Sequence, residues 1–459
     1  MKFRNISAAI VFFSSALFSQ HSLVNFSHIE HLSQRIAIGG DSVTIVHIYA
    51  DYPTYQWIDA NNEGIACVDD AARAAVAYLR HYELTKDRTN LEKGKELLKF
   101  ILQMQADDGH FYNFIYADHS INRTGQTSFK SFGWWAARGV WSMGVGYRIL
   151  KDSDPVFASV LQKEIEKTFP SLDTLLLKYG ATRKISGLTI PQWLLYESGS
   201  DATTELVLGL TEYYKATSDT RVKSYIEKLC DGMMVMQNGD LSSYPYGLHR
   251  SWETMWHAWG NGQTQALAEA GKVLNNEKMI ESAQREAEGF YSRLLILGFK
   301  REFDVVDSSK KREFEQIAYD IRPMAVGLLR LFDATNDSTY LTMAEIAASW
   351  FFGNNAASAQ MYDPASGRCY DGIHSSTDYS KNSGAESTIE ALNVMIELQP
   401  YLNGNNFIPI KKISGVESPQ FVFGLFHSGS DEIGLLVDKE HNRLSILKNE
   451  RLQEFKKTL

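Results

Sequence analysis

The sequence predicts a mainly α-helical protein in which six helical hairpins close into a ring, an (α/α)6 toroid, with a short strand region before the ring and a small β-rich extension after it. Polar or aromatic clusters open six apolar helical runs, at positions 69, 134, 201, 256, 320 and 384. The openings are 55 to 67 residues apart, which leaves room for two helices and their loops in each repeat. The runs after the openings are apolar on most faces and belong inside, whereas the segments between them carry one apolar stripe and belong outside.

The elements are expected in the following order. Residues 41–50 alternate between apolar and polar side chains, as a strand does, and short β-like runs begin at about residue 406. Five outer helices fit between the six inner ones, and residues 22–36 could supply the sixth. The clearest inner helices are expected at 71–79, 202–213, 323–332 and 387–398, and the clearest outer helices at 91–104, 219–234, 277–295 and 338–352.

The first twenty residues have the pattern of an export signal. Lys2 and Arg4 precede the apolar stretch 6–18, and small residues near Ser19 permit cleavage at about position 20. The alternative is a buried or anchoring helix. We therefore expect a secreted or periplasmic protein without a later membrane span. Its predicted parts are a signal peptide at 1–20, a catalytic ring at 21–403 and a β-rich extension at 404–459.

Composition and motifs exclude several classes of protein. The net charge of −9 argues against a nucleic-acid binder that neutralises phosphates. Phosphate-binding, dinucleotide-binding, zincin and serine-hydrolase motifs are missing from the sequence, so those chemistries lose their usual support. Cys67, Cys230 and Cys369 include no CxxC pair, which favours three buried thiols over a disulfide framework or a zinc site.

Six parallel inner helices would begin around one funnel, so their first turns hold the candidate catalytic residues. Glu386 opens the last inner helix and is the candidate general acid, although Ser383 and Glu386 also fit a capping box. Asp69 and Asp70 open the first inner helix. One of them would be the general base, with Asp69 preferred. The alternative is an N-cap followed by a first-turn acid.

Aromatic and polar residues of the same openings are candidates for substrate binding. Tryptophan faces stack on sugar rings, while Arg, His and Asn bind hydroxyl or carboxylate groups; the alternative for the tryptophans is core packing. Asp320 also fits a simple helix cap. The substrate-binding candidates are Tyr55, Trp57, Asn113, Asp118, Trp134, Trp135, Arg138, Trp256, His257, Asn261, Asp320, Arg322, Tyr370 and Asp371. Further residues of these openings and loops are Tyr52, Asp59, Tyr116, His119 and Trp259, with Glu197 and Asp201 as weaker candidates.

With these motifs, residues 40–400 resemble the six-hairpin (α/α)6 glycoside hydrolases. WFFGNN (350–355), followed by a loop and NSGAESTIEAL (382–392), is similar to the Gly-Asn loop and late Glu-bearing segment of glycoside hydrolase family 9 cellulases. The resemblance implies an early Asp as base and a late Glu as acid, acting with inversion. The sequence CVDD at 67–70 departs from that family's Asp-x-x-Asp pair. QIAYDIRPM and CVDDAARAA look more like less characterised bacterial toroid proteins.

We therefore expect a glycoside hydrolase that cleaves an oligo- or polysaccharide with two carboxyl groups and needs no metal or organic cofactor. Two alternatives stay open. One is a polysaccharide lyase or uronic-acid-directed enzyme on the same ring, which would use Asn113, Tyr116, His119, Arg138 and His257. The other is a non-catalytic glycan-binding protein, which would keep the aromatic residues and need no poised carboxyl group.

Overall fold

The computed structural model of the chain describes residues 22–59 and 63–457. The predicted signal peptide, at 1–20, lies outside the described residues. Within the described part, helices that combine the length and the apolar character of a membrane span are not found.

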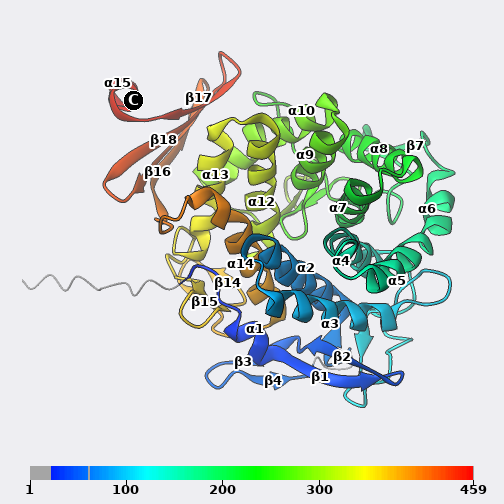
Figure 1. Ribbon diagram of the computed structural model, residues 1–459. Coiled ribbons are helices and arrows are strands. Elements are labelled where there is room, and N and C mark those ends of the chain that lie inside the picture. The colour runs from blue at the N-terminus through cyan, green and yellow to red at the C-terminus, as the bar shows by residue number, and fades with distance from the viewer. Residues whose placement is uncertain (1–21, 60–62, 458–459) are drawn as a thin grey trace, which may run out of the picture.

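Six inner helices form a closed ring (Figure 1). Each helix packs against the next along the chain, and the last packs against the first, so the two ends of the helical region lie side by side. Most of their residues are buried, as the apolar runs predicted. The inner helices are α2 (Val68–Thr85), α4 (Trp134–Leu150), α7 (Ser200–Thr217), α9 (Gln263–Leu274), α12 (Ala318–Thr335) and α14 (Ala385–Leu398).

Outer helices surround the ring, and five inner helices each pack on the outer helix that follows them. Helix α10 continues through a π-helical turn into α11, and 3-10 turns follow α13 and α14. The outer helices are α3 (Arg88–Met104), α5 (Pro155–Glu166), α6 (Phe169–Leu176), α8 (Thr220–Val235), α10 (Glu277–Glu286), α11 (Ser292–Leu297) and α13 (Ser338–Ala348).

The sixth outer position differs from the prediction. Only α1 (Ser27–Leu32) packs against α14 there, so a full helix over 22–36 is wrong. The chain turns to strand because Ser33–Ile38 (β1) pairs with Asp41–Val46 (β2) and buries Ile36 and Val43 beneath the pair. The strand predicted within 41–50 is confirmed by β2.

Four inner helices pass to their outer partners through the same two-residue turn. The inner helix ends at a residue in the left-handed conformation, and in three of the four turns the next residue is an Asp whose side chain accepts a backbone N–H of the outer helix. The turns are Lys86-Asp87, Ser218-Asp219, Asn275-Asn276 and Asn336-Asp337. Connections at the carboxyl ends of these inner helices are therefore short.

Long loops return from the outer helices to the amino-terminal ends of the inner helices. They carry small antiparallel sheets that stand around the start of the ring. Their strands are β3 (Tyr49–Asp51) with β4 (Gln56–Ile58), β5 (Ala66–Cys67) with β6 (Phe114–Ile115), β7 (Thr182–Ile185) with β8 (Leu188–Pro191), β9 (Met255–His257) with β10 (Glu302–Asp304) and β11 (Lys311–Arg312), β12 (Tyr362–Asp363) with β13 (Arg368–Cys369), and β14 (Ile373–Ser375) with β15 (Asp378–Tyr379).

A four-stranded antiparallel sheet follows the ring, in the region where the sequence predicts a β-rich extension. The sheet contacts α11 and α13, and β16 lies beside α13 in Figure 1. Its elements are β16 (Ile410–Glu417), β17 (Phe421–Ser428), β18 (Asp431–Asp438), β19 (Arg443–Leu447) and the final helix α15 (Asn449–Lys456).

Candidate active site

The amino-terminal ends of the inner helices share a network of buried charged side chains centred on Arg73 of α2. The Arg73 guanidinium donates to Asp70 at 2.7 Å and to Glu390 at 2.9 Å. It also donates to Glu386 at 3.2 Å, while its Nε donates to the backbone oxygen of Asp69 at 3.1 Å. Arg73 is fully buried. The network therefore joins the first and last inner helices, although Arg73 and Glu386 are 313 positions apart.

Arg322 of α12 carries the network across the ring. It donates to Glu390 at 2.6 Å and to Glu205 of α7 at 3.2 Å. The Tyr319 hydroxyl donates to Glu205 at 3.1 Å and accepts from Arg138 of α4 at 2.7 Å. Five inner helices thus contribute charged or phenolic side chains to one connected set.

The adjacent residues Asp69 and Asp70 have different environments. Asp69, 19% exposed, forms an ion pair with Arg138 at 2.6 Å and accepts from the Asn113 amide at 3.0 Å. Asp70 is 4% exposed and lies against Arg73. Burial raises the pKa of Asp70 to about 6, although Arg73 acts in the opposite direction. Asp69 is therefore the member of the pair whose carboxyl group reaches solvent.

Glu386 lies in the first turn of α14 with its side chain 44% exposed and one carboxyl oxygen held by Arg73. The capping box that Ser383 and Glu386 could have formed is not made. The N-cap is Gly384, and its N–H donates to Asp371 at 2.7 Å. Because Asp371 takes the capping role, the Glu386 side chain is left part-exposed to solvent.

Half-buried aromatic side chains stand next to Arg138. The Trp134 ring lies under the Arg138 guanidinium, 4.8 Å from it, and its centroid is 5.6 Å from that of Trp259. Trp259 lies 6.5 Å from Trp252, and the exposed Tyr196 accepts the Trp134 backbone N–H at 3.0 Å. We call Trp134, Trp259, Trp252 and Tyr196 the aromatic arc. Such faces can stack on sugar rings.

Three predicted binding residues lie in the protein core. Trp135 is buried and donates to the backbone oxygen of Phe111 at 2.7 Å. Trp256 is 2% exposed and packs edge-on against Phe290, 4.9 Å away, and Asn261 is buried as well. The expectation that Trp135, Trp256 and Asn261 line the cleft is therefore corrected, because these side chains fill the space behind it.

His257 supports the aromatic arc from behind. It is fully buried, its Nε2 lies 2.8 Å from Asp201, and its ring stacks on Trp259 at 3.9 Å. Its Nδ1 finds no hydrogen-bond partner among the described residues.

Candidates on the loops are spread over the rim. Tyr55 is buried and donates to the backbone oxygen of Lys381 at 3.2 Å. Trp57 is 41% exposed and stacks on His47 at 3.9 Å. Asp118 accepts from Ser120 in an exposed turn, so it is not brought to the network.

Asp320 is a helix cap. Its carboxyl group accepts the Ile317 backbone N–H at 2.9 Å and pairs with Arg301 at 3.0 Å. Burial raises the pKa of Asp320 to about 7, against the effect of Arg301. Tyr370 is half-buried, with its ring 5.9 Å from that of Tyr379.

Sequence reasoning did not select Arg73, Glu205 and Glu390 because they lie inside apolar runs, and it placed Tyr319 in an opening without giving it a role. A signal was present: in several inner helices a charged residue follows an opening residue by four positions, and such pairs share one helix face. The pairs are Asp69 and Arg73, Trp134 and Arg138, Asp201 and Glu205, and Glu386 and Glu390.

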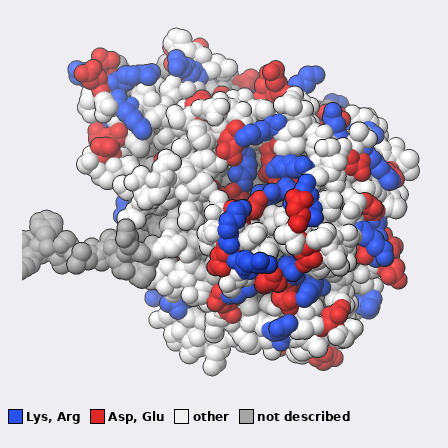
Figure 2. Space-filling view, in the orientation of Figure 1, with Lys and Arg blue, Asp and Glu red and all other residues white. Residues whose placement is uncertain are grey.

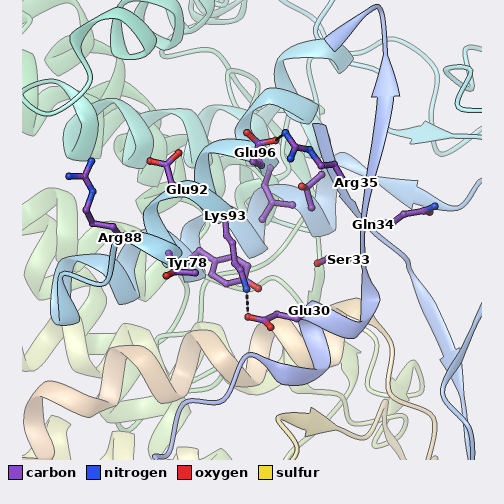
Figure 3. Close-up of a pocket in the computed structure, with 12 residues that line it drawn as sticks. Glu30, Ser33, Gln34, Arg35, Tyr78, Arg88, Glu92, Lys93 and Glu96 are labelled. Atoms are coloured by element: carbon purple, nitrogen blue, oxygen red, sulfur yellow. Dashed lines mark hydrogen bonds and ion pairs between the residues drawn. The ribbon is translucent and has the colours of Figure 1, made fainter. Parts of the chain in front are cut away.

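A cavity of about 610 Å³ lies outside the ring, between α1, β1 and α3 (Figure 3). In this view Lys93 reaches across to Glu30, and Arg35 lies beside Glu96, with Tyr78 behind Lys93. None of the network residues lines this cavity, so it is separate from the candidate site.

A second set of groups resembles a nucleophile with its base. Ser282 and His249 are 3.0 Å apart, and His249 lies 2.8 Å from Glu286. All three residues are at most 2% exposed. Because a substrate cannot reach Ser282, this set is structural.

Cys67, Cys230 and Cys369 are buried free thiols, as predicted. Over residues 22–59 and 63–457, groups of three or more His, Cys, Asp or Glu side chains arranged to hold a metal ion are not found.

The sequence matches no protein-family model and no curated protein significantly. Solved structures share the fold. A cellobiose 2-epimerase from Bacillus thermoamylovorans B4167 is 13% identical, with a TM-score of 0.55 over 77% of this chain and 92% of that chain. A D-mannose isomerase is 12% identical, with a TM-score of 0.55 over 78% and 92%. A sugar epimerase from a ruminal bacterium is 14% identical, with a TM-score of 0.54 over 77% and 92%. These likenesses establish the toroid fold and no particular family within it.

Proposed function

We propose that the protein is a carbohydrate-active enzyme, specifically a glycoside hydrolase with Asp69 as general base and Glu386 as general acid. One observation carries the proposal: two part-exposed carboxyl groups, from the first and the last inner helix, lie in one charged network at the amino-terminal ends of the ring. Arg73 binds the Glu386 carboxylate and the backbone oxygen of Asp69, while the Asp69 carboxylate pairs with Arg138. Glycoside hydrolysis requires such a pair of carboxyl groups with unlike roles.

Asp69 is suited to the base role. Arg138 and Asn113 hold its carboxyl group from two sides, so the position of the group is fixed by two partners. Asp70 is occupied by Arg73 and buried, so we assign it a structural role.

Glu386 belongs to a cluster in which carboxyl groups outnumber guanidinium groups. Four carboxyl groups, those of Asp70, Glu205, Glu386 and Glu390, share the two guanidinium groups of Arg73 and Arg322. Like charges in close proximity oppose one another's ionisation. Burial raises the pKa of Asp70, and Glu386 adds to that rise against the effect of Arg73. Glu386 is the exposed member of the cluster, so it is the one that a substrate can reach.

The proposed reaction follows from these roles. Asp69 takes a proton from water, the water oxygen attacks the anomeric carbon, and Glu386 gives a proton to the departing glycosidic oxygen. Inversion requires carboxyl groups about 6.5–9.5 Å apart. The aromatic arc beside Asp69 would stack on the sugar.

The test is a panel of oligosaccharides with product analysis, run on the parent and on Glu386→Gln. A hydrolase yields shorter products that together contain one added water. Glu386→Gln should reduce turnover about 10²–10⁴-fold, the usual contribution of general acid–base catalysis, with unchanged circular dichroism. Near-parental turnover would remove Glu386 from the mechanism.

Sugar epimerisation or isomerisation is the second candidate, because solved structures that share the fold are named as epimerases and an isomerase. The same panel separates the two: an epimerase or isomerase changes a free reducing sugar without changing its mass. A lyase would instead produce a new C=C bond, seen by ultraviolet absorbance.

Export is also proposed, on the basis of residues 1–20. Cell fractionation of the full chain would show the protein outside the cytoplasm and shortened at its amino terminus.

A further inference from the structure

A pocket of about 460 Å³ lies where the ring meets the C-terminal sheet. The end of α11, the loop before α12, the loop after α13 and the start of β16 form its walls. The backbone N–H of Lys412 donates to Asn354 at 2.9 Å, and that of Ile410 donates to Ser349 at 2.8 Å. These two bonds fix β16 against the ring, so the pocket has rigid walls.

The charge of the pocket is positive. Lys300, Lys411 and Lys412 line it, against one carboxyl group, that of Glu313. Within the described chain, none of these three ammonium groups has a carboxylate within ion-pair distance. All three lysine side chains are exposed to solvent, although the surrounding wall of the pocket lowers the pKa of Lys412 by partial burial. An anion in the pocket would supply these ammonium groups with a partner.

The remaining wall suits a sugar. Phe299 and Phe314 are half-buried and present apolar surface to the pocket. Gln316 is 3% exposed, and its amide donates to the backbone oxygens of Phe299 and Glu313, both at 3.3–3.4 Å. Its carbonyl oxygen is buried without a partner in the described residues.

We propose that this pocket is a second saccharide-binding site, selective for a sugar that carries a carboxylate or a sulfate. Lysine ammonium groups would pair with the anionic group, and the phenylalanine surfaces would cover the ring of the sugar. The site belongs to the junction with the sheet and shares no residue with the carboxyl pair Asp69 and Glu386, so it does not depend on the proposed hydrolysis.

Calorimetric titration of the full chain with three oligosaccharides of equal length tests the proposal. One is neutral, one contains glucuronate and one is sulfated. We expect the anionic sugars to bind and the neutral one to bind at least about fivefold more weakly, with the difference reduced at high salt. A stronger response to one anionic sugar than to the other identifies which anionic group the site takes.

Two variants locate the binding. Lys300→Ala combined with Lys412→Ala should weaken anionic binding about fivefold, whereas Lys163→Ala, an exposed lysine on α5, should not. Glu386→Gln should leave this binding unchanged, which separates it from the candidate active site. Equal binding of the neutral sugar, or anionic binding that survives the double change, would overturn the proposal.

Discussion

The two ends of the ring use the same kind of bond for different purposes. At the carboxyl ends of the inner helices, Glu212 is fully buried and accepts from Arg80 and Lys215, both at 2.7 Å, and from Arg148. Despite burial, these cations hold the pKa of Glu212 well below its usual range. At the amino-terminal ends, burial instead raises the pKa values of Asp70 and Asp320. At the carboxyl ends the buried acid has enough cationic partners to stay ionised. At the amino-terminal ends the buried acids have fewer cations around them.

The connections differ in the same way. Two-residue turns connect most inner helices at the carboxyl end, where a cavity of about 510 Å³ is lined by Arg80, Lys215 and Arg330, while long loops with small sheets and the aromatic arc surround the amino-terminal end. Figure 2 shows acidic and basic side chains intermingled around the middle of one face, over the inner helices. The comparison teaches that the balance of charge differs between the two ends. At the amino-terminal ends four carboxyl groups share the two guanidinium groups of Arg73 and Arg322, whereas at the carboxyl ends the buried Glu212 alone has three cationic partners.

The largest expected effect is on catalysis at the amino-terminal end. Asp69→Asn keeps the side-chain volume and a group that Asn113 can contact, but removes the proposed base. We expect turnover to fall about 10²–10⁴-fold, measured on the best substrate of the panel.

Asp70→Asn is the matched control. It lies next to Asp69 on α2 but faces Arg73, so turnover should fall much less than in Asp69→Asn. If the two variants lose turnover equally, Asp69 has no special role and the base must be sought elsewhere.

The second prediction concerns the carboxyl end. Glu212→Gln leaves Arg80, Lys215 and Arg148 without their shared buried acid, so the free energy of unfolding should fall by about 3 kcal/mol. Urea unfolding measures this. Turnover of the protein that remains folded should stay near the parental value, and a selective loss of turnover would show that this end also takes part in catalysis.

The third prediction concerns the pH dependence of stability. The pKa of Asp320, ordinarily 3.8, is about 7 in the fold because of burial. The folded protein therefore binds this proton more tightly than the unfolded chain, and the stability that the proton supplies is lost as pH rises from about 4 to 7. Asp320→Asn should make melting temperature less dependent on pH over this range.

His28 acts in the opposite direction, because burial lowers its pKa to about 4 and stability falls as pH drops below 6.5. His28 is present in both the parent and Asp320→Asn, so its contribution cancels when the melting temperature of one is subtracted from that of the other. If the melting temperatures of the two proteins change with pH by the same amount, the raised pKa of Asp320 is contradicted.

The sequence predicts the ring well because helical periodicity is a local property. Inner helices carry apolar side chains all round, and the positions of Glu386 and Asp69 in first turns place them at the same end. The sixth outer helix is shorter than the sequence predicts. Residues 33–38 pair with 41–46 as β1 and β2, and the helical pattern of residues 22–36 does not reveal this pairing.

The site is harder to predict because neighbouring residues of one type take different roles. Trp134 joins the aromatic arc while Trp135 is buried, and the direction of each ring depends on helix orientation. Arg73 and Glu390 escaped notice because a charge within an apolar run is usually an isolated surface feature. Here each finds its partner on another helix, which only the closed ring reveals.

The contact between α2 and α14 has a consequence for synthesis of the protein. Arg73 is made early, and the Glu386 that it holds is made 313 residues later. A growing chain, or one cut short by a premature stop, therefore contains Arg73 and lacks Glu386. The contact between the first and last inner helices can form only when translation is almost complete, so shortened chains cannot close the ring.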